Sequence, residues 1–262
     1  MPTGKWFCGN FIILDMKIIP LSEGSFTVDQ TKKFLPFKPG ADNLQERSKG
    51  SLLVEIQPFA IITSKDVLVL DTGLGYAEEN GELQIHNILA ANGIVADDVT
   101  KVLLSHLHKD HAGGIALPDK KRLSFKNANY YINEHEWAFA FENKSSSYFI
   151  EQFECLKNNT QLVLTGASGS IDEYIHYEMT NAHSPYHQVF FIEENGEKIF
   201  FGGDVAPQLQ QMRNRFKAKY DYDGTKAMEL RIKWWKQGEK EKWTFLFYHD
   251  IRYPFYKFPG AA

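Results

Sequence analysis

Cysteine is scarce in this chain, with only Cys8 and Cys155 among 262 residues. One disulfide between them is arithmetically allowed, but two cysteines exclude a disulfide framework. Neither belongs to a CxxC motif or has a neighbouring basic residue that would mark a reactive thiol. We therefore expect both to be small buried hydrophobic residues.

Positive charge and long hydrophobic runs are also in short supply. The 29 basic residues are outnumbered by 33 acidic ones, and the net charge of −4 argues against a nucleic-acid-binding surface. Basic residues gather at 231–242, but glutamates interrupt them, as on a solvated helix face. The apolar run at 11–14 is too short to span a membrane, and no signal-peptide pattern surrounds it. These absences predict a cytoplasmic protein with a small-molecule substrate, no nucleic-acid partner and no membrane partner. The oligomeric state stays open, a homodimer included.

The glycine-rich turn at 71–75 is not a phosphate-binding loop. It follows the apolar run 67–70 but lacks the Gly-Lys-Ser/Thr ending of a P-loop. A buried strand that runs into such a turn instead indicates a strand tip opening onto a site.

What is present suffices for a substantial core, since 43% of the residues are hydrophobic and 14% aromatic. The length fits one large domain, so we expect residues 1–262 to form a single unit. Apolar runs predict strands at 11–20, 51–63, 67–71, 101–105, 129–132, 161–164, 171–177, 188–193, 198–201 and 243–248. Helical patterns occur at 83–91, 148–156, 207–220 and 225–237, with Gly238 as the last stop, and Asn133 with Glu136 suggests a capping box. Two strand groups, each with helices, indicate two sheets packed face to face and covered outside by helices.

The polar segment 31–50 contains two prolines and shows little periodicity. A loop of that length in a compact domain is often a flap over a site, and a surface insertion is the alternative. The sequence favours neither.

The most informative stretch reads His-Leu-His-Lys-Asp-His at residues 106–111. It follows the apolar run 101–105, and alternate side chains of a strand share a face, so we expect His106 and His108 to project together. Asp110 and His111 then lie in the turn, where the following glycines let the backbone bend tightly. Three of the nine histidines within six positions, beside an aspartate, indicate a metal site rather than a chance polar turn.

Further ligand types stand where other apolar strands meet loops. His183 and His187 flank a proline turn before the strand at 188–193. Asp204 follows the strand at 198–201, and His249 follows the strand at 243–248. Rigid strand ends of this kind can hold a metal site.

These segments, together with Asp71-Thr72-Gly73, resemble the metallo-β-lactamase superfamily over most of the chain from residue 71 onward. The resemblance implies an α/β fold, an αββα four-layer sandwich, with the site at one edge of the two sheets. It also implies that Asp71 orients a metal-binding histidine, since an acceptor behind the ring fixes its tautomer and orientation.

The resemblance assigns the metal ligands residue by residue. One ion would be held by His106, His108 and His187, a second by Asp110, His111 and His249, with Asp204 bridging them. His183 competes with His187 for the fifth histidine position. We prefer His187, because it directly abuts the strand, and expect His183 to play a supporting or merely solvated part.

Two departures from the superfamily's pattern bear on the reaction. Members that cleave β-lactams often carry Cys where this chain has Asp204, which disfavours antibiotic hydrolysis. Some lactonases carry a tyrosine three residues later, where this chain has Pro207, so that hydrogen-bond donor is either absent here or supplied by another residue such as Tyr186. The segments 204–207 and 220–223 look more like the branch with organophosphate hydrolases and esterase-lactonases. Phe37, Tyr186 and Tyr253 are candidates to line a hydrophobic substrate pocket, with core packing as the alternative.

Imidazole and carboxylate donors suit two divalent metal ions, Zn²⁺ first, with Mn²⁺, Fe and Co²⁺ also compatible. We hypothesise a metal-dependent hydrolase in which a metal-bridging hydroxide attacks a small ester, lactone or phosphotriester. Asp110 would orient this nucleophile and pass a proton to the leaving group.

Other functions stay open on the same residues. A mononuclear iron persulfide dioxygenase would use two histidines and one aspartate for iron, and a glyoxalase II-like enzyme would hydrolyse thioesters. A nuclease is disfavoured by the acidic balance, and a non-catalytic metal-binding protein by the full set of donors. Metal quantification with a substrate panel separates these alternatives.

Overall fold

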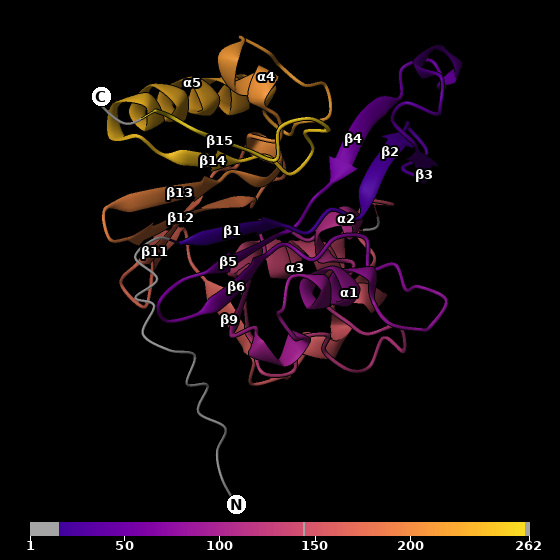
Figure 1. The fold of residues 1–262 in the computed structure, drawn as a ribbon, viewed down its shortest axis with the longest axis vertical. Helices are drawn as coiled ribbons and strands as arrows, with labels where there is room; N and C mark the ends of the chain where they lie inside the picture. The colour runs from indigo at the N-terminus through magenta and orange to yellow at the C-terminus, as the bar shows by residue number, and fades with distance from the viewer. Residues whose placement is uncertain (1–15, 144, 260–262) are drawn as a thin grey trace, which may run out of the picture.

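Two six-stranded sheets form the centre of the molecule (Figure 1). The computed structural model describes residues 16–143 and 145–259. The first sheet has the order β1-β5-β6-β7-β8-β9, made of Lys17–Pro20, Phe59–Ile62, Val67–Leu70, Lys101–Leu103, Asn129–Asn133 and Leu162–Thr165. The second has the order β10-β11-β12-β13-β14-β15, made of Ser168–Ile171, Ile175–Met179, Gln188–Glu194, Glu197–Phe201, Thr244–Leu246 and Phe255–Lys257.

Three hydrophobic clusters show that the layers are stacked helix, sheet, sheet, helix. The strands alternate: on β12, Phe190 and Ile192 pack between the two sheets, whereas Val189 packs toward the outer helices. Helices α1 (Gln84–Ala91) and α3 (Glu134–Glu142) cover the first sheet. Helices α4 (Leu209–Arg213) and α5 (Gly224–Glu241) cover the second (Figure 1). The predicted αββα sandwich is confirmed.

A third sheet projects from this body at one side (Figure 1). Its strands are β2 (Gly24–Val28), β3 (Phe34–Phe37) and β4 (Leu52–Ile56), with β2 in the middle and antiparallel to both neighbours. The segment 31–50 is therefore not a plain loop, because it contributes β3 and a 3-10 turn at Leu44–Glu46. The single strand predicted at 51–63 is wrong as well. It divides at Pro58 into β4 and β5, which belong to different sheets.

Several predicted helices differ from the structure. The helix expected at 148–156 consists of two 3-10 turns, Ile150–Gln152 and Glu154–Leu156. The helix expected at 207–220 is limited to α4. Gly238 does not end α5, and a Cβ there would lie 2.3 Å from the Phe245 ring, so this glycine permits close packing of the helix on β14. The strand at 171–177 is a hairpin of β10 and β11, and β15 was not expected.

Two further predictions concern the cysteines and the membrane. Cys8 and residues 11–15 of the first predicted strand lie outside the described residues. Cys155 is a free, half-buried thiol, and burial raises its pKa to about 11. No helix within residues 16–143 and 145–259 is both long and apolar enough to cross a membrane.

The topology brings the candidate ligands to one edge of the sandwich. Strands β6, β7 and β8 are parallel, and so are β13 and β14, so the chain leaves each group at a common end. Strand β12 is antiparallel to β13, which places its beginning beside the end of β13. The residues before β12 and those after β6, β7, β13 and β14 therefore meet.

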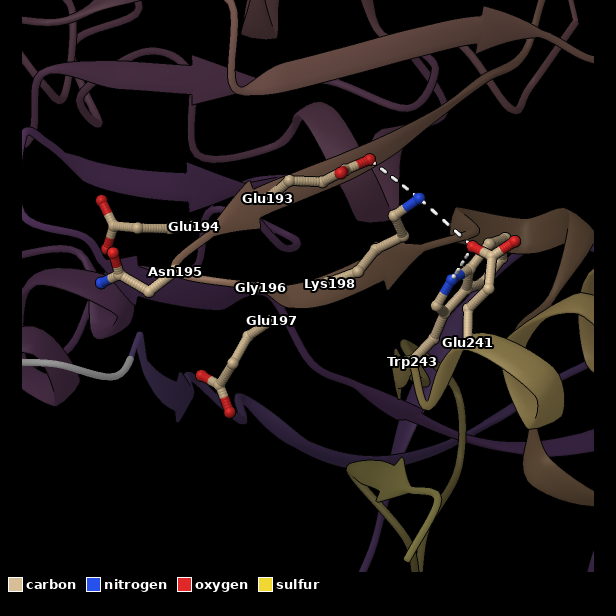
Figure 2. A pocket seen from close by; sticks show the side chains of 8 residues that line it. All are labelled: Glu193, Glu194, Asn195, Gly196, Glu197, Lys198, Glu241 and Trp243. Atoms are coloured by element: carbon tan, nitrogen blue, oxygen red, sulfur yellow. Dashed lines mark hydrogen bonds and ion pairs between the residues drawn. The ribbon is translucent and has the colours of Figure 1, made fainter. Parts of the chain in front are cut away.

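The opposite end of β12 and β13 carries a surface hollow (Figure 2). There Lys198 Nζ lies 2.9 Å from Glu193 Oε1 and 3.4 Å from Glu241 Oε2. A seven-residue strand spans about 20 Å, so this hollow is remote from the ligand edge. Its ion pairs belong to the solvated surface.

Candidate metal centre

Seven donor side chains meet in two groups at the ligand edge of the sandwich, where the chain leaves β6, β7, β13 and β14. The ligand atoms of His106, His108, His183 and Asp204 all lie within 4.8 Å of one another. Those of Asp110, His111 and His249 form a second group with the same limit. Six of these seven residues are the ligands expected from the sequence.

The Asp204 carboxylate joins the two groups. Its Oδ2 lies 3.2 Å from His183 Nε2. Its Oδ1 lies 2.9 Å from His249 Nε2 and 3.1 Å from His111 Nε2. This is the arrangement that a bridging ligand requires.

The structure places His183, and not His187, among the clustered donors. His187 is fully buried, and its Nε2 accepts the backbone N–H of Asp204 at 3.2 Å while its Nδ1 lies 3.2 Å from Thr180 Oγ1. Both of its nitrogens are therefore occupied within the protein. His183 instead reaches the cluster from the proline turn, since its Nε2 lies 3.3 Å from His108 Nδ1. His187 supports the backbone of the bridging residue rather than offering a free donor.

The two histidines after β7 are held by a loop, not by the strand expected from the sequence. Strand β7 ends at Leu103, and His108 directly precedes the short helix α2 (Lys109–Ala112). His106 Nε2 and His108 Nδ1 face each other at 2.9 Å. The Leu107 N–H between them donates to Glu136 Oε1 at 3.0 Å, which fixes the loop.

Glu136 is a supporting residue whose role the sequence analysis missed. Asn133 caps α3 as expected, by accepting the N–H groups of His135 and Glu136. The Glu136 carboxylate is buried and accepts from Tyr148 Oη at 3.1 Å and Ser184 Oγ at 3.2 Å. The Glu136 carboxylate therefore faces the ligand loops. In the sequence, Glu136 is interpreted only as part of a helix cap, so this contact was missed.

Asp71 lies behind the second group of donors. Its Oδ2 lies 2.7 Å from His111 Nδ1 and accepts Ser105 Oγ at 2.7 Å, while Oδ1 accepts the Ser105 N–H at 2.7 Å. Glycines make this approach possible. A Cβ on Gly113 would lie 2.2 Å from the Leu74 backbone, so the turn after β6 packs backbone to backbone on the end of α2.

The charges and protonation of the donors fit divalent cations. Burial, with the neighbouring imidazoles, holds the pKa values of His106 and His108 well below the ordinary value, so both rings are neutral and can donate lone pairs. Burial alone would lower the pKa of His111, but the carboxylates of Asp204, Asp110 and Asp71 raise it well above the ordinary value. Positive charge is thus favoured among these carboxylates. Buried His111 Nε2 and Asp204 Oδ1 form no conventional hydrogen bond, which is consistent with a cation as their partner.

The aromatic rings at the cluster differ from those proposed. Tyr248 stacks on His111 at 4.1 Å, Tyr148 packs on His108 at 4.9 Å and Tyr220 on His183 at 5.9 Å, measured between ring centroids.

The three residues proposed for the substrate pocket are not among these tyrosines packed on the donor histidines. Tyr186 packs on His135 and Phe139, Phe37 is buried on β3, and Tyr253 is half exposed between β14 and β15. None of the three makes a ring contact with a donor residue in the described ranges.

Comparisons with known proteins point to hydrolases. The chain is 29% identical over 148 residues to an atrochrysone carboxyl ACP thioesterase of Passalora fulva, covering 56% of this chain and 37% of that protein. It is 26% identical over 172 residues to an N-acyl homoserine lactonase of Bacillus thuringiensis, covering 65% of this chain and 63% of that protein. The matches thus span about two fifths and just under two thirds of these relatives.

A solved structure shares the fold at greater coverage. AidC, a dizinc quorum-quenching lactonase in complex with a product, superposes with a TM-score of 0.70 at 20% identity over 95% of both chains. The sequence profile of the metallo-beta-lactamase superfamily matches residues 55–247, which include six of the seven clustered donors, and His249 lies just beyond that range. This chain belongs to the metallo-beta-lactamase superfamily.

Proposed function

We propose that this protein is a metal-dependent hydrolase that opens lactones, with two divalent ions held by the seven clustered donors. The observation that carries the proposal is the position of the Asp204 carboxylate, with one oxygen toward each group. One ion would be held by His106, His108 and His183, the other by Asp110, His111 and His249, with Asp204 shared. Zn²⁺ suits these donors best.

When bound, such ions polarise a substrate oxygen and make water nucleophilic at neutral pH. The protein's part is to hold the donors rigidly and to manage protons. Asp204 stays ionised, because the nearby histidines hold its pKa well below the ordinary value against the effect of burial. Asp110 Oδ2 lies 3.7 Å from His111 Nε2 and 3.6 Å from His249 Nε2, in a side chain that is 13% exposed. It can therefore accept a proton from the nucleophile and pass it to the leaving oxygen.

Tyr220, rather than Tyr186, is the tyrosine we propose as hydrogen-bond donor to the substrate. Its ring packs on His183, and its Oη accepts from Gln211 Nε2 at 3.3 Å. Burial raises its pKa to about 12, so the phenol keeps its proton at neutral pH. The hydroxyl hydrogen is then available to a substrate oxygen on which charge develops.

Lactones are the first choice of substrate because a lactonase is among the sequence relatives and among the solved structures of the same fold. Thioesters are the second, because a thioesterase is also a relative. Cytoplasmic location, the single-domain organisation of residues 1–262 and the absence of nucleic-acid or membrane partners remain predictions from the sequence.

The test is a substrate panel on the purified protein loaded with Zn²⁺. N-acyl homoserine lactones, p-nitrophenyl esters, phosphotriesters and acyl thioesters are compared by kcat/KM, with chelator-treated protein as the control. We expect lactone opening that is lost with the chelator and restored by Zn²⁺. Higher kcat/KM on thioesters would favour the second candidate. One iron per chain, with oxygen consumption on a persulfide, would contradict a hydrolase altogether.

A further inference from the structure

Asp221 is a buried carboxylate beside the metal centre that is not one of the clustered donors. Its side chain is 1% exposed, and its Oδ1 lies 3.0 Å from Nδ1 of His183. Its other oxygen is buried without a hydrogen-bond partner among the described residues. Burying a carboxylate costs free energy unless the group is paired, so the position of Asp221 beside His183 calls for an explanation.

The segment that carries Asp221 is fastened to the His183 loop by its backbone. The Tyr222 N–H donates to the His183 carbonyl at 3.0 Å, and the Asp223 N–H donates to the Ala182 carbonyl at 2.7 Å. Asp223 then caps α5 by accepting the N–H groups of the next helical residues. These main-chain bonds hold the loop in place without the Asp221 side chain, so mere attachment does not explain the carboxylate.

The two nitrogens of His183 face opposite partners. Nε2 points at the cluster, 3.2 Å from Asp204 Oδ2, and Nδ1 points at Asp221. An imidazole that binds a cation through Nε2 keeps its proton on Nδ1, and an acceptor behind Nδ1 fixes both the tautomer and the ring orientation. A carboxylate in that place also makes the donor nitrogen more basic.

The other group of donors has the same construction. His111 has Asp71 behind its Nδ1 at 2.7 Å, and His249 has the Glu55 carbonyl oxygen behind its Nδ1 at 2.7 Å. Asp221 supplies the corresponding acceptor for His183, although it lies 38 positions away in the chain.

We propose that Asp221 is a positioning residue that holds His183 as the Nδ1–H tautomer, with Nε2 aimed at the metal ion of the first group. This inference rests on the proposed metal-dependent function. It predicts that Asp221 sets metal affinity as well as turnover.

The test measures Zn²⁺ affinity by competition with a chromogenic chelator, without substrate. Asp221→Ala should weaken binding of the more weakly held ion by about 10- to 100-fold, the range found for residues behind metal ligands. Asp221→Asn should lose less, since its Oδ1 still accepts from Nδ1–H. Asp223→Ala is the matched control: it removes the cap of α5 from the same segment and should lower thermal stability while leaving affinity within twofold.

A double substitution separates positioning from general damage. In a His183→Ala background, Asp221→Ala should cause no further loss of affinity, because the imidazole it orients is absent. Nitrogen-15 NMR of the Zn²⁺-loaded parent should show a His183 Nδ1–H resonance that Asp221→Ala removes or broadens.

The outcomes are distinguishable. Parent-like affinity in Asp221→Ala, an equal loss in Asp223→Ala, or a full loss that persists in the His183→Ala background would each overturn the inference alone. A parent protein that binds no Zn²⁺ or Co²⁺ would overturn the proposed function and this inference with it.

Discussion

Glu23 should make the protein less stable as the pH rises toward neutrality. This glutamate is 6% exposed; its Oε2 accepts the Leu74 N–H at 2.6 Å, and its Oε1 has no partner among the described residues. Burial is the main cause that raises its pKa from 4.5 to about 7, and the charge of Asp110 adds to this rise. The backbone N–H groups of Leu74 and Gly75 lower the pKa, but by less than burial raises it. The carboxyl group thus supports the turn that carries Asp71, and it stays protonated in the folded protein at pH values below about 7.

The sign and size follow from proton linkage. Between pH 4.5 and about 7 the unfolded chain releases the Glu23 proton while the folded protein retains it. Because the folded state then binds more protons, the free energy of unfolding falls as the pH rises through this window. At about 1.4 kcal/mol per pH unit, the loss is about 3 kcal/mol at pH 8 relative to pH 4.

The assay compares urea unfolding of the parent and Glu23→Gln between pH 4 and 8 at one fixed Zn²⁺ concentration. Metal uptake changes with pH in both proteins and largely cancels in their difference. The glutamine still offers an oxygen to the Leu74 N–H but does not titrate. Its stability relative to the parent should therefore rise by about 3 kcal/mol across the range.

An exposed glutamate provides the control for the loss of one charge. Glu79→Gln removes one negative charge from an exposed side chain, and its stability difference from the parent should change far less across this pH range than that of Glu23→Gln. Parallel curves for the parent and Glu23→Gln would refute the reasoning, because they would mean that Glu23 ionises alike in the folded and unfolded states.

Two further predictions concern the ligand loops. His183→Ala should weaken Zn²⁺ binding by more than about 100-fold, because it removes a donor. His187→Ala removes only a support for the Asp204 backbone and should weaken binding by about 10- to 100-fold. The reverse order of the two losses in a chelator competition would contradict the ligand assignment. Gly113→Ala should lower the free energy of unfolding by about 1–3 kcal/mol or more, because its Cβ would meet the Leu74 backbone at 2.2 Å. Gly166→Ala, with nothing within 4 Å, is the control and should be nearly neutral in thermal unfolding.

The sequence predicted those parts of the site that are written in short local patterns. A polar residue of the site follows each of the apolar strands β6, β7, β13 and β14 within three residues, and parallel neighbours deliver such residues to one edge. The αββα arrangement followed from two groups of alternating strands with helices in each. The order of apolar runs and turns therefore indicated the architecture, and the resemblance to the metallo-β-lactamase superfamily assigned six of the seven clustered donors.

The sequence could not predict features of the site that depend on contacts between residues far apart in the chain. His183 and His187 both flank the same proline turn, and only the Thr180 and Asp204 contacts show that the nitrogens of His187 are occupied. The carboxylate of Glu136 fits a capping box in sequence, yet in the fold it faces Leu107. No periodicity encodes such pairings, because they depend on how loops from different strands meet.

The most direct test of a shared pair of ions is metal quantification of Asp204→Asn beside the parent. Asp204 lies 3.2 Å from His183 Nε2 and 2.9 Å from His249 Nε2, one carboxylate oxygen toward each. The parent should contain two Zn²⁺ per chain, and the variant should fall toward one and lose most lactone turnover. A variant that keeps two ions and the full rate would contradict the bridging role of Asp204.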